Sequence, residues 1–315
     1  MLEKVNGSRE KVVKFSSDLE SNILELSRQL ESKSYCPKGF KNFTLFDPKE
    51  REISAPYFRD RVVHRSLHRV LEPIFEKRFI YDTYACRPNK GTHAGVDRLQ
   101  GFMRKQDTDY YLKCDIRAYF DSVDHSILVQ EVGRKVSDER VLWLVKKFLE
   151  NYSSNIGENK GMPIGTLYSQ LFANIYLDRF DHFVKQSLEA SYYIRYMDDF
   201  ILLSDSKNRL HGLKDAMQGY LESELELDLP DSKTTLEPIE KGATFLGYRV
   251  FPHYLLLRKR NKLKFKRRLS RQKGELKNGE LSFQELRQSI ASWRGHAEHA
   301  DTENLRREYR GELRG

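Results

Sequence analysis

The sequence predicts an α+β protein with a body of short strands and helices and a helical C-terminal tail. Paired runs of β-branched and aromatic residues indicate strands, and apolar residues at helical spacing indicate the helices between them. The 315 residues, 39% of them apolar and 12% aromatic, are enough to bury a large core. Strands that carry carboxylates follow the first helices, which is an order typical of an α+β body.

The N-terminal third predicts helices around one strand hairpin. Residues 16–32 have the spacing of an amphipathic helix, residues 43–46 and 51–55 indicate two strands, and a further helix opens at Asp60. Lys49 and Arg51 lie on this hairpin. Such cations are either solvated or, if the hairpin overhangs an anionic ligand, able to hold a triphosphate.

Residues 84–95 predict a turn that leads into a helix. Arg87 and Lys90 stand there beside small residues, which permit a close approach of the backbone to another molecule. The turn is either a plain loop or a contact to a nucleic-acid backbone, and the sequence leaves both open.

The middle of the chain predicts two strand regions separated by helices. Residues 110–116 indicate a buried strand that carries Asp115 near its end, and residues 192–203 indicate a hairpin with Asp198 and Asp199 at its bend. Further elements are expected at 119–125 and 141–149 (helices), 161–170 (a Gly/Pro turn feeding a long helix), 210–225 (a helix) and 245–251 (a strand pair).

The three aspartates predict a magnesium site. Adjacent carboxylates at Asp198 and Asp199 repel each other unless a cation lies between them, although a solvated turn would also explain the pair. Asp115 at the end of an apolar strand needs a partner as well. Asp121 and Asp124 are set aside because they can cap a helix. Mg²⁺ prefers oxygen ligands, and two such ions can clamp an in-line displacement at phosphorus.

The formal charge of +9 favours a polyanionic partner, with membrane headgroups as the rival. No apolar run is long enough to span a bilayer and no secretory signal is evident, so we expect a cytoplasmic protein without membrane contact. The densest cationic segment, residues 258–273, predicts a duplex-facing surface, although a solvated face would show the same charges. The residues expected to contact nucleic acid there are Arg258, Lys259, Arg260, Lys264, Arg267 and Arg268.

Cys36, Cys86 and Cys114 are widely spaced and include no CxxC pair, which indicates reduced thiols. His296 and His299 have neither a cysteine nor a third histidine near them in the sequence, so we expect structural roles for both.

Two further residues could contact a nucleotide substrate or take part in its reaction. Tyr119, four residues after Asp115, could lie under the sugar and exclude a 2′-hydroxyl, or it could be a core aromatic. Lys233 could protonate the leaving pyrophosphate.

Three segments in this order resemble the polymerase motifs of reverse transcriptases. They are residues 115–121 (Asp-Ile-Arg-Ala-Tyr-Phe-Asp), 196–199 (Tyr-Met-Asp-Asp) and 245–248 (Phe-Leu-Gly-Tyr), and the resemblance extends over about residues 43–300. Residues 84–88 and 292–297 are similar to the bacterial branch related to group II introns. Residues 164–170 (Ile-Gly-Thr-Leu-Tyr-Ser-Gln) resemble reverse transcriptases of diversity-generating retroelements, since most other members have Gln at the first position and Pro at the last.

The resemblance implies a right-hand polymerase fold. It places an N-terminal helix and fingers in residues 1–108, a palm in 109–251 with a fingers-contributing segment around 155–170, and a short helical thumb in 252–315. The implied catalytic residues are Asp115, Asp198 and Asp199, the implied metal ligands are these three with Ile116, and the implied nucleotide contacts are Lys49, Arg51, Tyr119, Ile164, Gly165, Gln170 and Lys233. Two Mg²⁺ ions, or Mn²⁺ in their place, would be the cofactors.

The resemblance further implies RNA-directed synthesis of error-prone cDNA from a template-repeat RNA, with a DNA or RNA primer, dNTPs and an accessory variability protein as partners. An aliphatic Ile164 cannot hydrogen-bond near the incoming sugar, which would lower discrimination between nucleotides. Residues after the 245–251 strand pair suffice for a thumb but not for DNA-binding and endonuclease extensions, so we do not expect a complete intron maturase.

Three alternatives remain open. One is another bacterial reverse transcriptase of the retron, phage-defence or group II intron type. A second is a non-catalytic RNA-binding protein on a polymerase body, and a third is an RNA-dependent RNA polymerase, which Tyr119 disfavours.

Overall fold

The structure is a computed structural model that describes residues 12–46, 50–152, 154 and 156–303, with only the backbone of residues 45, 46, 50 and 51. Its helices are α2 (Leu19–Glu31), α3 (Phe58–Glu76), α4 (Thr92–Met103), α5 (Tyr119–Ser122), α6 (His125–Gly133), α7 (Glu139–Glu150), α8 (Leu167–Tyr176), α9 (Asp178–His182), α10 (Lys207–Leu225), α11 (Lys259–Lys277) and α12 (Phe283–Ala297). Its strands are β1 (Phe40–Phe46), β2 (Glu50–Pro56), β3 (Tyr110–Asp115), β4 (Tyr193–Tyr196), β5 (Asp199–Ser204), β6 (Thr235–Pro238), β7 (Ala243–Phe245), β8 (Tyr248–Val250) and β9 (Leu255–Leu257). None of the described helices combines the length and apolar character that crossing a bilayer demands.

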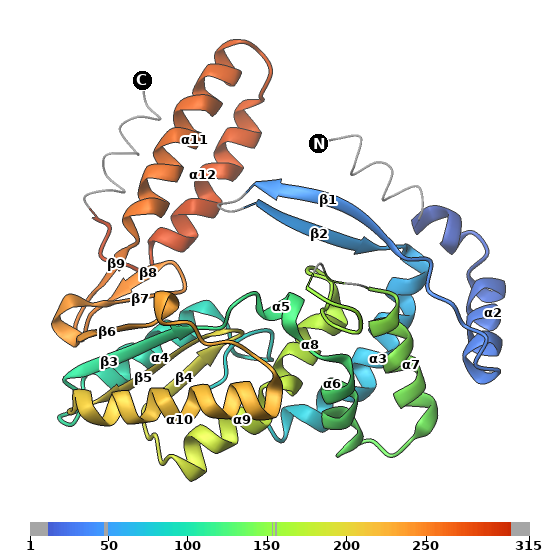
Figure 1. Cartoon of the computed structure of the whole chain (residues 1–315). Coiled ribbons are helices and arrows are strands. Elements are labelled where there is room, and N and C mark those ends of the chain that lie inside the picture. The colour runs from blue at the N-terminus through green and yellow to red at the C-terminus, as the bar shows by residue number, and fades with distance from the viewer. Residues whose placement is uncertain (1–11, 47–49, 153, 155, 304–315) are drawn as a thin grey trace.

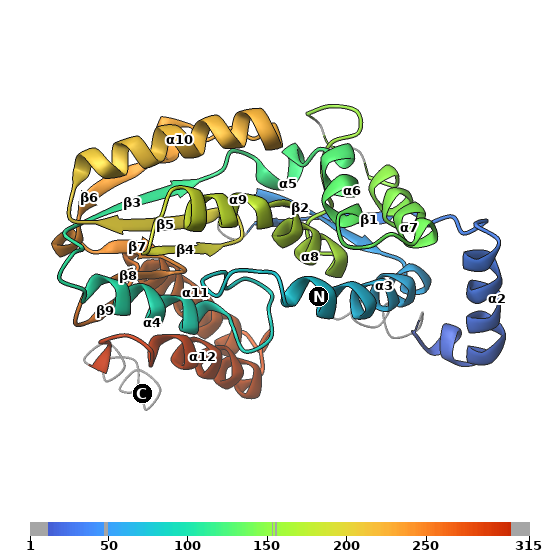
Figure 2. The ribbon, with the colours of Figure 1, turned by 90° about the horizontal axis from the view of Figure 1, so that it is seen from below.

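A four-stranded antiparallel sheet with the order β4-β5-β3-β6 forms the centre of the body. Side chains alternate between its faces. On one face Leu112 and Cys114 join a cluster that includes residues of α10, and on the other face Tyr111 joins a cluster that includes residues of α4. Figure 2 shows the sheet between these two helices. The predicted α+β class is confirmed, and the sheet separates two hydrophobic cores.

A smaller antiparallel sheet, β7-β8-β9, carries the helix pair α11–α12 at one end of the molecule (Figure 1). The helices are joined by a parallel stack of Phe265 on Trp293, with ring centroids 3.9 Å apart. The Tyr248 hydroxyl donates to the backbone carbonyl of His296 (2.8 Å) and lies 2.9 Å from His296 Nδ1, while the His299 ring stacks on His93. His296 thus ties α12 to the small sheet, and His299, just after α12, packs on α4, which fits the structural roles expected for them.

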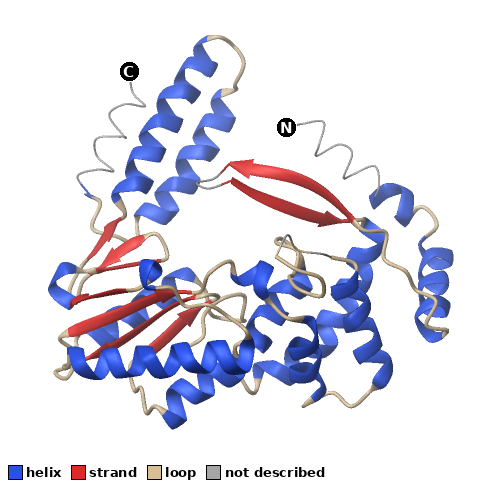
Figure 3. Cartoon of the chain, viewed as in Figure 1, coloured by secondary structure: helices blue, strands red, loops and turns tan. Residues whose placement is uncertain are grey.

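The β1–β2 hairpin lies above the same side of the body as α11 and α12 and extends from near α3 toward α12 (Figures 1 and 3). Its attachment to the body includes a backbone bond from Ser54 N to Ile164 O (3.2 Å). This contact places the hairpin directly beside the segment that precedes α8.

Two predicted helices differ in the structure. The helix expected from residue 119 is interrupted: α5 has one turn with Ala118 at its N-cap, and Asp124 caps the separate helix α6 through the backbone of Ser126 and Ile127. The capping role is therefore confirmed for Asp124 and wrong for Asp121. The long helix expected after residue 167 ends as α8 at Tyr176, and α9 continues it after Leu177.

Candidate functional site

The three aspartates meet at one end of the central sheet. Asp115 ends β3 directly opposite Asp199, the first residue of β5. Because directly opposed side chains of antiparallel strands share a face, these two carboxyl groups are neighbours. The backbone of Ile116 donates to the carbonyl of Asp198 (3.3 Å), which holds the β4–β5 turn against the end of β3. Residues separated by more than 80 positions are thereby brought into one acidic site.

Lys113 is paired with one of these carboxylates. It lies two positions before Asp115 on the same face of β3, and its Nζ donates to Asp199 Oδ2 (2.7 Å) and to the carbonyl of Thr244 (2.8 Å). Burial, with a smaller contribution from the nearby Asp198 and Asp115, raises the pKa of Asp199 to about 6 against the lowering effect of Lys113. Asp199 Oδ1 is buried and has no hydrogen-bond partner among the described residues. An orphaned carboxylate oxygen of this kind has room for one more cation or donor.

Lys233 occupies the other side of the acidic site. It comes from the short helical turn Asp231–Lys233, and its Nζ donates to Asp115 Oδ1 and to the carbonyl of Ile116 (3.2 Å). A carboxylate and a carbonyl oxygen are ligands that Mg²⁺ also uses, so the donor set fits a divalent cation. Within the described parts of the chain no three acidic, histidine or cysteine side chains are grouped closely enough to hold a metal ion. Lysines bind two of the three carboxylates.

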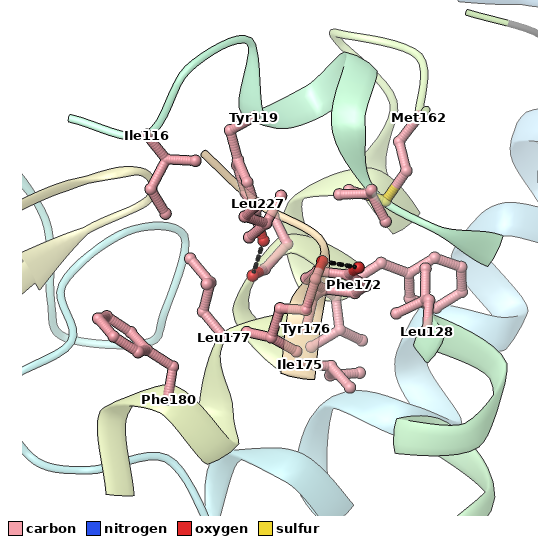
Figure 4. Packing of buried hydrophobic residues seen from close by; sticks show 14 of the residues in the cluster. Ile116, Tyr119, Leu128, Met162, Phe172, Ile175, Tyr176, Leu177, Phe180 and Leu227 are labelled. Carbon is pink, nitrogen blue, oxygen red and sulfur yellow. Dashed lines mark hydrogen bonds between the residues drawn. The ribbon is translucent and has the colours of Figure 1, made fainter. Parts of the chain in front are cut away.

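Tyr119 lies in the core and not at the surface of the site. Its side chain is 2% exposed, and its hydroxyl donates to the carbonyl of Ala173 (2.6 Å). Figure 4 shows it directed into the cluster that contains Phe172 and Tyr176. The preceding Ala118 has a positive φ of 44°, a sharp local turn of the chain just before this inward-pointing ring. This burial argues against the nucleotide contact predicted for Tyr119 and favours its alternative role as a core aromatic.

The segment before α8 forms the neighbourhood of the predicted nucleotide contacts. Ile164 and Gln170 are half-buried, and Gly165 is exposed with a φ of +100°. A Cβ at Gly165 would stand 3.1 Å from Ile53 Cγ2, so both backbone angle and space favour glycine under the hairpin. Arg51 lies on β2 opposite Leu45, but its side chain and all of Lys49 are outside the described residues.

Arg87 and Lys90 are turned toward the protein. The Arg87 guanidinium binds both carboxylate oxygens of Glu76 and donates to the carbonyls of Ile80 (2.7 Å) and Thr83 (3.0 Å). Lys90 donates to the carbonyl of Tyr81 (2.8 Å), and burial lowers the pKa of its ammonium group. With its donors engaged, Arg87 holds the turn together, which argues against the predicted contact to a nucleic-acid backbone.

The predicted duplex-facing cations lie on α11 or just before it. Arg258 is the N-cap residue, and Lys259, Arg260, Lys264 and Arg267 are exposed, whereas Arg268 is half-buried beside the Phe265 ring. Positions 260, 264 and 267 follow a helical spacing of four and three, so they share one face of α11. The helix therefore presents a cationic face on one side and an apolar one on the other.

Sequence reasoning missed Lys113 and the buried pair Arg195–Asp181. The first could have been found from strand alternation, because residues 113 and 115 of one strand must share a face. The second joins a strand to a short helix, which spacing along the chain does not reveal.

Sequence comparison places the chain among known proteins. The family described as "Reverse transcriptase (RNA-dependent DNA polymerase)" matches residues 41–250. The protein YkfC of Escherichia coli (strain K12) is 28% identical over 271 residues, which cover 72% of this chain and 67% of YkfC. The group II intron-encoded protein LtrA of Lactococcus lactis subsp. cremoris is 22% identical over 300 residues, which cover 73% of this chain and 50% of LtrA. The chain thus spans between half and two thirds of the length of these two relatives.

The fold is similar to that of solved telomerases. A structure of telomerase from Candida tropicalis in complex with a fragment of telomeric RNA matches with a TM-score of 0.54 at 14% identity, covering 85% of this chain and 55% of that one. The likeness at this identity concerns the fold alone, and it is that of a polymerase built from antiparallel sheets and helices. Since the family match covers residues 41–250 of 315, this protein belongs to the reverse transcriptases, a family of RNA-directed DNA polymerases that use divalent metal ions.

Proposed function

We propose that the chain copies RNA into DNA by metal-assisted nucleotidyl transfer at the Asp115–Asp198–Asp199 site. The observation that carries this proposal is the register that sets Asp115 opposite Asp199, with Ile116 bonded to Asp198, at the end of the central sheet. Carboxylates gathered at one sheet end, one of them with a buried oxygen that has no hydrogen-bond partner among the described residues, suit a divalent metal and a polyphosphate substrate.

The carboxylates of Asp115, Asp198 and Asp199 and the carbonyl of Ile116 would hold two Mg²⁺ ions, or Mn²⁺ as a substitute. When bound, these ions would activate a primer 3′-hydroxyl and neutralise the triphosphate. Lys113 keeps Asp199 charged in its buried position. Lys233, released from Asp115 as the metal binds, would stand beside the triphosphate and donate a proton to the leaving pyrophosphate.

We assign the other predicted contacts to the same reaction. Lys49 and Arg51 of the hairpin, with Ile164, Gly165 and Gln170 before and within α8, would contact the incoming nucleotide, and the cationic face of α11 would bind the duplex. On this proposal residues 1–108 would form the N-terminal helix and fingers, 109–251 the palm with a fingers-contributing segment around 155–170, and 252–315 the thumb.

The finer assignment rests on Ile164 and Gln170. These residues favour an enzyme of a diversity-generating retroelement, which would make cDNA mutated at template adenines from a template-repeat RNA and work with an accessory variability protein. A group II intron-like reverse transcriptase is the second candidate, favoured by the similarity to LtrA. Sequencing of cDNA made by wild type and Ile164→Gln distinguishes them. An unchanged error rate at template adenines would contradict the role of Ile164.

Primer extension on an RNA template tests the activity itself. Wild-type protein with Mg²⁺ should incorporate dNTPs and not rNTPs, and Asp198→Asn should lose at least about 10³-fold in rate, because it removes a carboxylate from the metal site. The control is Asp205→Asn, an exposed aspartate just beyond the other end of β5, which should retain activity. RNA binding without any incorporation by the wild type would instead support the non-catalytic RNA-binding protein.

A further inference from the structure

A fully buried ion pair lies beside the turn between β4 and β5, residues 197–198, which is called the catalytic turn because it carries Asp198. Arg195 of β4 and Asp181 of α9 both have side chains with 0% exposure. Their contact is bidentate, with Nε donating to Asp181 Oδ1 (2.7 Å) and Nη2 donating to Asp181 Oδ2 (2.6 Å). This geometry is the strongest arrangement available to an arginine and a carboxylate, because both donors of the fork are aligned.

The pair is surrounded by further partners. The Tyr193 hydroxyl donates to Asp181 Oδ1 (2.6 Å), and the Thr83 hydroxyl donates to Asp181 Oδ2 (3.1 Å). The remaining arm of the guanidinium, Nη1, donates to Asn174 Oδ1 (3.3 Å) and to the carbonyl of Met197 (2.9 Å). Burying two charges costs several kcal/mol per ion unless they are paired and hydrogen-bonded, and this network supplies both conditions.

The bond to Met197 reaches the catalytic turn directly. Met197 has a φ of 56°, a conformation that residues other than glycine hold only when their surroundings enforce it. Its carbonyl belongs to the same planar peptide unit as the backbone N–H of Asp198. By fixing that carbonyl, Arg195 fixes the plane from which the Asp198 side chain departs.

We propose that Arg195, anchored by Asp181, is a positioning residue that aims the Asp198 carboxylate and thereby sets the divalent-metal affinity of the site. This inference rests on the proposed function, since it assigns Asp198 to the metal. Asn174 lies in α8 one turn after Gln170, so the same network also joins the turn to the helix on the nucleotide side. If the pair served only to hold α9 against the sheet, its loss would change stability and leave metal affinity unaltered.

The test is Arg195→Lys, because lysine can still pair with Asp181 but lacks the third nitrogen that reaches Met197. Mn²⁺ binding to the protein alone, followed by electron paramagnetic resonance, gives a measurement that is independent of activity. We expect affinity to fall about 10- to 100-fold, which is typical for groups that orient metal ligands. Tyr193→Phe and Thr83→Val are matched controls that remove hydrogen bonds to the same Asp181 away from the turn, and they should keep Mn²⁺ affinity within about twofold of wild type.

If Arg195→Lys does not fold, the double variant Arg195→Met/Asp181→Leu replaces the pair with apolar side chains and leaves no buried charge unpaired. It should fold and show the same loss of Mn²⁺ affinity. Wild-type affinity in either folded variant, or an equal loss in Tyr193→Phe, would overturn the positioning role. Asp198→Asn separates the two levels: if it abolishes synthesis while Arg195→Lys matches its controls, the polymerase assignment stands and this inference alone fails.

Discussion

Two ion pairs near the turn between β4 and β5 use the same chemistry at different depths. Arg195 and Asp181 have no exposed side-chain surface, whereas the side chains of Lys233 and Asp115, the outer pair, are 35% and 38% exposed. The buried pair has a partner for each charged group, and breaking it would leave a charge without solvent. The outer pair can exchange its partner for water, a metal ion or a phosphate at little cost. The difference in burial therefore makes Arg195–Asp181 a permanent structural pair and Lys233–Asp115 a pair that can exchange partners.

The largest expected effect is on the buried pair. Arg195→Met leaves Asp181 charged and enclosed, so the free energy of unfolding should fall by about 3–5 kcal/mol. Urea denaturation followed by circular dichroism measures this. Arg209→Met, an exposed arginine at the start of α10, serves as the control and should change stability little. A loss below about 1 kcal/mol for Arg195→Met would place the buried pair in the same class as surface pairs.

For the outer pair, Lys233–Asp115, we expect a large effect on the reaction rate and a small effect on stability. Lys233→Met should lower kcat about 10²-fold through loss of the proton donor, and it should alter the free energy of unfolding by no more than about 1 kcal/mol. Single-turnover extension with Mg²⁺ and denaturation of the same preparation give both values. Lys241→Met, which removes an exposed pair with Glu237, is the control. Unchanged kcat in Lys233→Met would leave Lys233 as a merely structural neighbour of Asp115.

A third buried group, His64, should make the stability of the protein depend on pH. The His64 ring makes edge-to-face contacts with the rings of Phe148 and Tyr168, with centroid distances of 4.5 and 4.7 Å. Burial lowers the pKa of His64 to about 3. In the unfolded chain it binds a proton below about pH 6.5. Between pH 6.5 and 3 the unfolded state therefore binds more protons, and stability falls as the pH falls.

At pH 5 this contribution amounts to about 2 kcal/mol. Chemical denaturation at pH 7.5 and pH 5 should show it in wild type, and His64→Phe should be less sensitive to acid by that amount. His211→Phe, on the exposed side of α10, should keep the wild-type pH response. Equal acid sensitivity of His64→Phe and wild type would mean that the pocket admits water and the proton.

The smallest effect is expected on the cationic face of α11. Arg267 is exposed, so Arg267→Ala should weaken duplex binding modestly and reduce the slope of log K against log salt by about 1, with no change in stability. Arg209 belongs to α10, which lies on the other side of the central sheet from α11 (Figure 1), so Arg209→Ala should leave the slope as in wild type. If Arg267→Ala leaves the slope of log K against log salt unchanged, the duplex does not contact this face of α11.

The sequence patterns located the strands that carry the aspartates, because alternation and turn residues mark 110–116 and 192–203 strongly. They did not reveal β6 and β9, which have four and three residues and exist mainly through pairing with β3 and β8. The burial of Tyr119 was one of two open alternatives, and it is decided by packing and a hydrogen bond to Ala173, which lies 54 residues further along the chain. The contacts of Arg87, Lys233 and Arg195 depend on which elements pack together, and periodicity along one segment carries no information about that.

The separation of the two cores by the central sheet limits how this chain can change. A deletion or insertion of one residue within β3 would invert the side chains that follow it, sending Leu112 and Cys114 toward the α4 side and the acidic end of the strand away from Asp199. Substitutions of similar size would leave both cores filled. Descendants of this sequence should therefore vary in the composition of β3 but keep its length, and length changes should collect in the loops between helices.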